Sequence, residues 1–139
     1  MKYARVERER RFLLRDVPAD LPETWNLVTD WYLRGTRLRL RQVESAGGNV
    51  VARKLTQKFS SAEDSPDKTT ITNFYLNEAE FDLLRTLGGS QVRKKRYQYA
   101  TNASQLVIDV FEDVLDGLIL AEVEFQDDQS MSAFEQPDF

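Results

Sequence analysis

Charged side chains recur at every second position in five separate segments of this 139-residue chain. Because successive side chains of a β-strand point to opposite faces, each charged set lies on a single face, and the reverse faces are mostly apolar. One such strand is typical of any sheet that packs on one side and meets water on the other. Five of them would bring eight cations and four carboxylates onto one concave surface if the sheet closes. These residues are Glu7, Glu9, Arg11, Arg37, Arg39, Arg41, Lys54, Lys58, Lys94, Arg96, Glu122 and Glu124.

The alternation predicts a mainly β (α+β) fold with eight antiparallel strands. Turn residues that tolerate positive φ, such as Arg34-Gly35 and Asp116-Gly117, separate most of the alternating segments, as hairpins require. Eight antiparallel strands with few helices favour a closed β-barrel, because closure removes unpaired sheet edges. We expect strands at residues 3–14, 26–32, 36–43, 50–59, 69–76, 91–100, 106–111 and 118–125.

Two stretches that interrupt the strands are expected to form short helices that pack on the barrel wall. Residues 18–25 are punctuated by proline. Residues 77–87 carry stronger signals, with Asn77 as N-cap, Glu80 in capping-box position and Phe81 on an apolar face. No linker separates domains, so we expect one domain over residues 1–139, with a loose acidic tail at 126–139.

The chain contains no cysteine and no histidine. Their absence excludes thiolate nucleophiles, disulfides, Cys/His zinc sites and imidazole bases, so any chemistry must use carboxylates, amines, hydroxyls or metals. No apolar run approaches the ~20 residues that a bilayer span needs, and the N-terminus carries charged, strand-like sequence in place of a signal peptide. We therefore expect a cytoplasmic protein without a membrane partner.

A barrel with a charged interior must hold water, ions or a ligand, because desolvating unpaired charges costs several kcal/mol each. Arginine and lysine together suit phosphate oxygens. Pairs of glutamates on separate strands offer hard oxygen ligands of the kind that Mg²⁺ and Mn²⁺ prefer. The mixture indicates a polyphosphate bound with a metal. Nucleic acid is not expected as a partner, because two pairs of carboxylates on the same wall would repel a phosphate backbone.

The charged strands form an ordered series of motifs that resembles the CYTH family, also called triphosphate tunnel metalloenzymes, over almost the whole chain. Residues 7–11, Glu-Arg-Glu-Arg-Arg, look like the family's N-terminal Glu-x-Glu-x-Lys signature, with Arg11 where lysine is usual. The later strands match in the right order, at residues 38–41, 55–58, 94–97, 108–111 and 117–125. The resemblance implies an eight-stranded antiparallel tunnel that binds a small-molecule triphosphate.

The resemblance also implies a role for each charged set. The triphosphate would be held by the basic positions, Arg11, Arg37, Arg39, Arg41, Lys58, Lys94 and Arg96. One or two Mg²⁺ or Mn²⁺ ions would be held by Glu7, Glu9, Glu122 and Glu124, with Asp109 either as a further ligand or as the salt-bridge partner of Arg96. The expected catalytic residues are Glu7, Glu9, Lys54 and Lys58, among which the proton-transfer group stays open.

Three functions remain open at this point. The first is metal-dependent hydrolysis of an inorganic or organic triphosphate. The second is a class IV adenylate cyclase, which converts ATP to cyclic AMP and pyrophosphate and needs an adenine pocket as well. The third is a polyphosphate or nucleotide binding module without turnover. The third gains weight because residues 72–75, Thr-Asn-Phe-Tyr, lack the carboxylates that family members often carry on the fifth strand.

The C-terminal segment also departs from the family pattern. Residues 134–137, Phe-Glu-Gln-Pro, match a Phe-x-x-Pro stretch after which family members usually continue, whereas this sequence stops at Phe139. We expect a more open tunnel mouth, a relaxed specificity, or cover from a second copy of the chain in a homodimer.

Overall fold

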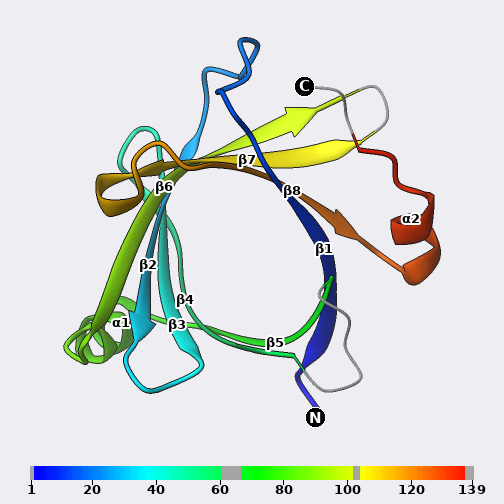
Figure 1. Ribbon diagram of the computed structural model, residues 1–139. Helices are drawn as coiled ribbons and strands as arrows, with labels where there is room; N and C mark the ends of the chain where they lie inside the picture. The colour runs from blue at the N-terminus through cyan, green and yellow to red at the C-terminus, as the bar shows by residue number, and fades with distance from the viewer. Residues whose placement is uncertain (1, 61–66, 102–103, 137–139) are drawn as a thin grey trace.

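The computed structural model describes residues 2–60, 67–101 and 104–136, and it forms a closed barrel of eight antiparallel strands (Figure 1). The strands follow one another around the barrel in the order β1-β5-β4-β3-β2-β6-β7-β8, and β8 pairs with β1 to close it. The predicted fold class is therefore confirmed. The strands are β1 (Arg5–Leu13), β2 (Asn26–Leu33), β3 (Leu38–Ser45), β4 (Val50–Phe59), β5 (Lys68–Tyr75), β6 (Gly89–Ala100), β7 (Gln105–Glu112) and β8 (Ile119–Phe125).

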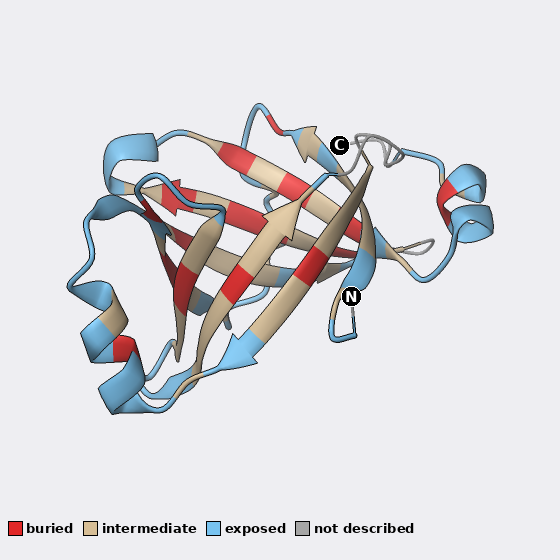
Figure 2. Cartoon of the chain, turned by 90° about the horizontal axis from the view of Figure 1, so that it is seen from below, coloured by how far each residue is buried: buried red, intermediate tan, exposed pale blue. Residues whose placement is uncertain are grey.

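The apolar core lies on the outer face of the barrel wall, because the strands turn their charged faces inward. Leu14, Ile108, Ile119 and Ala121 form a buried cluster over β7 and β8. Figure 2 shows buried positions as separate bands along the strands, as expected where alternate side chains face different surroundings. The barrel is thus packed mainly from outside, and its lumen is lined by charged and polar side chains together with a few apolar ones such as Ile71 and Phe111.

Residues 18–25 do not form the predicted helix. The described backbone between β1 and β2 consists of turns and irregular segments. Pro22 lies in the middle of this stretch and lacks the N–H that a helix interior needs. Side-chain contacts hold the segment against the barrel instead. Asp20 accepts a 2.7 Å hydrogen bond from the Tyr99 hydroxyl, Leu21 packs on the outer core, and the Lys95 ammonium lies 4.6 Å from the centre of the Trp25 ring.

The second predicted helix is confirmed as α1 (Glu78–Arg85), which packs on β3 and β4. The capping box forms as expected: the Glu80 backbone N–H donates to Asn77 Oδ1 at 2.8 Å, and the Asn77 N–H donates back to Glu80 Oε1 at 2.9 Å. Phe81, 1% exposed, meets Trp31 of β2 edge to face at 5.4 Å between ring centres. This pair attaches the helix to the outside of the wall.

The acidic tail carries a short helix, α2 (Asp128–Ala133), with Met131 buried. The Phe134 ring packs on Phe125 at 5.2 Å and on Phe12 at 5.8 Å. Asp128 pairs with Arg8 of β1 at 2.8 Å. The tail is therefore attached to the outer face of β1 and β8 as far as it is described. Among the described helices, none is long and apolar enough to cross a membrane.

Candidate functional site

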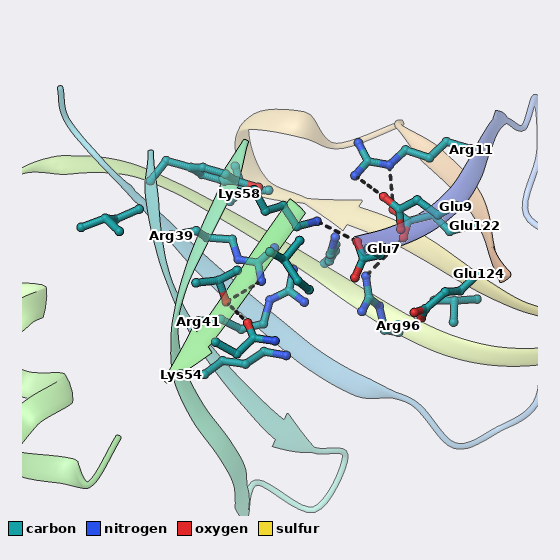
Figure 3. A pocket seen from close by; sticks show the side chains of 18 of the residues that line it. Glu7, Glu9, Arg11, Arg39, Arg41, Lys54, Lys58, Arg96, Glu122 and Glu124 are labelled. Atoms are coloured by element: carbon teal, nitrogen blue, oxygen red, sulfur yellow. Dashed lines mark hydrogen bonds and ion pairs between the residues drawn. The ribbon is translucent and has the colours of Figure 1, made fainter. Parts of the chain in front are cut away.

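A cavity of about 580 Å³ runs inside the barrel. Its wall includes all twelve residues of the charged alternating sets. Their side chains come from β1, β3, β4, β6 and β8, and from Arg37, which directly precedes β3 (Figure 3). Asp109 of β7, the thirteenth predicted site residue, is fully buried beneath the cavity lining, where it pairs with Lys94 and Arg96. The geometric expectation that alternate positions converge on one interior is confirmed.

Glutamates from β1 and β8 form an acidic cluster at one side of the cavity. Arg11 bridges two of them, with Nη2 donating to Glu9 Oε1 at 2.9 Å and Nε 3.4 Å from Glu122 Oε1. Burial, and then the charges of Glu122 and Glu7, raise the pKa of Glu9 above its usual value. Burial lowers the pKa of Arg11, but Glu122 and Glu9 raise it by more. Burial and the two neighbouring carboxylates thus outweigh the lowering effect of Lys58 and Arg11 on the pKa of Glu9.

The donor chemistry of the acidic cluster fits a hard divalent cation. Carboxylate oxygens are the ligands that Mg²⁺ and Mn²⁺ prefer, and a cation would relieve the repulsion around Glu9. Within the described ranges, no three acidic side chains already converge as a ready-made cage. Holding a metal would therefore require the carboxylates to shift from Arg11 and Lys58. The residues that would hold it are Glu7, Glu9, Glu122 and Glu124.

Asp109 forms ion pairs with two cations, so its oxygens are not free to bind a metal. Arg96 donates to its two oxygens at 2.8 and 2.9 Å, and the Lys94 ammonium lies 3.0 Å from Oδ2. Burial would raise the pKa of Asp109, but Arg96 and then Lys94 lower it below its usual value. The salt-bridge interpretation of Asp109 is confirmed, and we leave this residue out of the proposed metal ligands.

The β3 arginines face β2 and β4. Arg41 makes a bidentate pair with Asp30 of β2, at 2.6 and 2.9 Å. Arg39 donates from Nη2 to the Thr56 hydroxyl at 3.2 Å, and Thr56 donates to Asn73 Oδ1 at 2.6 Å. Among the described residues, the buried Arg39 Nε has no hydrogen-bond partner, although Asp30 Oδ1 lies 3.8 Å away. A buried donor without an acceptor costs free energy, so this atom is suited to donate to a bound anion.

Lys54 of β4 stands beside these arginines and makes no hydrogen bond or ion pair with any residue that the structure describes. Burial, and then the charges of Arg41, Arg39 and Arg96, lower its pKa to about 8. Burial and the charge of Arg41 likewise lower the pKa of Arg39. The two shifts have the same causes, burial first and then the charges of neighbouring cations.

The prediction missed several residues in or against the cavity, among them Asp30, Arg5, Tyr32 and Asn73. Arg5 extends the charged face of β1 by one more alternate position, so the alternation could have found it. Asn73 and Tyr32 carry no charge, and Asp30 is the one charged residue in β2. Because no other charged residue alternates with Asp30 along β2, the pattern of charges did not identify it. Its role depends on Arg41, the residue opposite it in the strand register.

No protein-family model and no curated protein matches the sequence. Among solved structures, the inorganic triphosphatase NE1496 aligns with 94% of this chain and 81% of its own, at a TM-score of 0.57 and 23% identity. A candidate adenylate cyclase from Bacillus halodurans aligns with 94% and 86%, at a TM-score of 0.60 and 15% identity. PH1012 from Pyrococcus horikoshii aligns with 89% and 82%, at 0.54 and 16%.

The chain has the fold of CYTH-type tunnel proteins. The tunnel explains why charge can be tolerated inside so small a domain. Apolar packing on the outside supports the wall, and charged side chains line the lumen, with Glu9 and Glu122 on one side and Arg39 and Lys54 on the other (Figure 3).

Proposed function

We propose that this protein hydrolyses a small-molecule triphosphate, inorganic or organic, in the tunnel cavity with the help of Mg²⁺ or Mn²⁺. The observation that carries the proposal is that one cavity holds a group of basic side chains and a group of acidic side chains whose charges are incompletely paired. Lys54 has no carboxylate partner among the described residues, and Arg39 Nε makes no hydrogen bond there, although Asp30 lies 3.8 Å away. Glu9 keeps a raised pKa despite its hydrogen bond from Arg11. A polyphosphate with a bound metal would supply an anion to the first two and a cation to the third.

The basic side of the cavity would bind and orient the phosphate chain. Arginine can engage two phosphate oxygens in its planar fork, and lysine acts as a point charge. Lys54 carries this role first because it has no carboxylate partner among the described residues. Arg39 joins it because Asp30, 3.8 Å away, is bound more closely by Arg41. Arg96 and Lys94, already paired with Asp109, would form the wall beside them. Fixed cations of this kind stabilise the charge that develops on phosphoryl oxygens during transfer.

The acidic side would hold the metal through Glu7, Glu9, Glu122 and Glu124. A divalent cation there would supply polarisation of the phosphoryl group and a lower pKa for a bound water. Lys54 is the side chain best suited to hold or move a proton, because a pKa of about 8 lets the amine exist in both forms near neutral pH. Lys58, whose ammonium lies 3.3 Å from Glu7 Oε1, is tied to the acidic side instead.

A product assay tests this proposal. The purified chain is incubated with Mg²⁺ or Mn²⁺ and either tripolyphosphate or ATP, and phosphate, pyrophosphate and cyclic AMP are measured. We expect phosphate release from tripolyphosphate that stops when the metal is chelated. Cyclic AMP together with pyrophosphate would instead identify an adenylate cyclase. Tight binding of tripolyphosphate without any product would identify a binding module, and either result would overturn hydrolysis as the function.

A further inference from the structure

Asp30 is a buried carboxylate in the middle of the basic side of the tunnel. It lies on β2, directly opposite Arg41 of β3 in the strand register, and its side chain is 1% exposed. Its two oxygens accept hydrogen bonds from Arg41 Nε and Nη2 at 2.6 and 2.9 Å, while Arg39 Nε lies 3.8 Å from Oδ1. Burial would raise the pKa of Asp30, but Arg41 and then Arg39 and Lys94 lower it, so the group is anionic.

This geometry makes Asp30 an internal substitute for phosphate. A carboxylate presents two oxygens to the guanidinium fork in the same manner as a phosphate group does. In the free protein Asp30 uses two of the three guanidinium nitrogens of Arg41, a residue whose side chain lines the cavity. Without this partner, Arg41 would face Arg39 and Lys54 with no carboxylate on its own side of the cavity. Asp30 therefore keeps the basic side assembled while the tunnel holds no ligand.

We propose that Asp30 is a positioning residue that competes with the triphosphate for Arg41. Asp30 thereby weakens triphosphate binding but holds the Arg41 side chain in the orientation that turnover needs. The inference rests on the proposed function, because it takes the phosphate chain to bind beside Arg39 and Arg41. The fixed negative charge repels the incoming polyanion and occupies part of its binding surface. In return, it holds Arg41 in one orientation, so that the phosphates meet a fixed wall.

Two opposing effects decide what removal of the charge would do. Asp30→Asn frees the Arg41 fork for phosphate and removes a like charge from the vicinity of the ligand, which favours binding. It also lets Arg41 move, which costs ordering entropy on binding. Within a few ångströms and at the effective dielectric of a protein cavity, the repulsion between like charges exceeds the cost of ordering one side chain. Binding should therefore become tighter, whereas the turnover that depends on orientation should become slower.

The test measures binding and turnover separately. Tripolyphosphate is titrated into wild-type and Asp30→Asn protein by calorimetry in the presence of a chelator, so that no metal and no hydrolysis contribute. We expect Kd to fall about tenfold in the variant. With Mg²⁺ restored, kcat for tripolyphosphate should fall at least tenfold while KM does not rise. The matched control is Asp82→Asn on the exposed face of α1, for which all three constants should stay at the wild-type values.

Asp30→Glu provides a second variant that keeps the charge but shifts its position. It should hold Kd within about threefold of wild type and still lower kcat, and it keeps the test available if Asp30→Asn does not fold. A Kd that is unchanged or weaker in Asp30→Asn, or tighter by tenfold in Asp30→Glu, would overturn the role of Asp30. Failure of the wild type to bind tripolyphosphate would overturn the proposed function and this inference together. Binding without turnover by the wild type would overturn hydrolysis alone, and the Kd comparison would still decide the role of Asp30.

Discussion

The ammonium of Lys58 on β4 lies 3.3 Å from a carboxylate oxygen of Glu7 on β1, although β5 separates these two strands in the sheet. A contact of this kind requires the wall to curve until side chains two strands apart meet inside it. It joins the basic and acidic sides of the tunnel in the ligand-free state. The contact is also one that a polyphosphate and a metal would both have to displace, because each would bind one of its two partners.

Glu9→Gln should abolish metal-dependent turnover of tripolyphosphate, because the amide cannot supply a charged oxygen to the metal. The loss should not come from unfolding. The raised pKa of Glu9 means that the folded state binds its proton more tightly than the unfolded state does, so the ionised side chain opposes folding above that pKa. The neutral variant should therefore unfold at an equal or higher temperature than the wild type.

The control for Glu9 is Glu23→Gln, a neutralisation of an exposed glutamate between β1 and β2. Phosphate release by this variant should match the wild type. Retention of activity in Glu9→Gln, with an unchanged dependence on Mg²⁺ concentration, would contradict the assignment of the acidic cluster to the metal. Glu124→Gln tests the same assignment from β8 and should also abolish turnover.

Lys54 should make tripolyphosphate binding weaken as the pH rises. Its pKa of about 8 in the free tunnel means that the amine is mostly charged at pH 7 and mostly neutral at pH 9. Binding of the anion favours the charged form, so above pH 8 each binding event must also take up a proton, and affinity falls by up to tenfold per pH unit. Calorimetry at pH 7 and pH 9 measures this loss.

Lys54→Met separates this effect from the titration of the ligand itself. The variant should bind more weakly than wild type at pH 7, and the two proteins should converge at pH 9. Lys95→Met, which changes a lysine that contacts Trp25 on the outside of the barrel, should keep the wild-type pH dependence. Parallel pH profiles for wild type and Lys54→Met would show that Lys54 does not contact the bound phosphates.

Asp109→Asn should destabilise the barrel by about 3 kcal/mol, because it leaves Arg96 and Lys94 as buried cations without their common partner. The depressed pKa of Asp109 makes its contribution dependent on pH. Stability from this carboxylate is present above its unfolded-state pKa and is lost as the pH falls through the lower folded-state value. Urea unfolding at pH 7 gives the difference. A free energy of unfolding within about 0.5 kcal/mol of wild type would refute the buried-pair account.

Phe81→Ala should lower stability by about 3 kcal/mol without altering the tunnel. Phe81 is buried between α1 and the outside of the wall, where it packs on Trp31, and it does not line the cavity. Urea unfolding measures the loss, and kcat measured well below the unfolding temperature should equal that of the wild type. A large change in kcat would show that the outer packing also shapes the site.

Much of the fold could be predicted from the sequence because charge alternates with apolar residues along the strands. In β3, for example, Arg39 and Arg41 alternate with Leu38 and Leu40, which fixes both the strand and the face that turns inward. The same alternation identified the residues that line the cavity. It could not show which of these cations are already paired with a carboxylate of the protein, because such pairing depends on the register between strands.

Asp30 and residues 18–25 show the limits of such a prediction. Asp30 is the one charged residue in β2, and its role comes from its pairing with Arg41 on the neighbouring strand β3. Residues 18–25 include Pro18 and Pro22, and contacts with the barrel, including the hydrogen bond between Asp20 and Tyr99, hold them in a non-helical conformation. Tertiary contacts override a weak local preference in a segment this short.

The central claim is that the interior of the barrel binds a triphosphate between its basic and acidic sides. A crystal structure of the protein grown with tripolyphosphate and Mn²⁺ tests it directly, since the anomalous signal locates the metal. We predict a phosphate chain against Arg39 and Lys54 inside the tunnel, with Mn²⁺ bound by glutamates of β1 and β8. Tripolyphosphate bound on the outer surface, with the tunnel cavity holding only water, would contradict the claim.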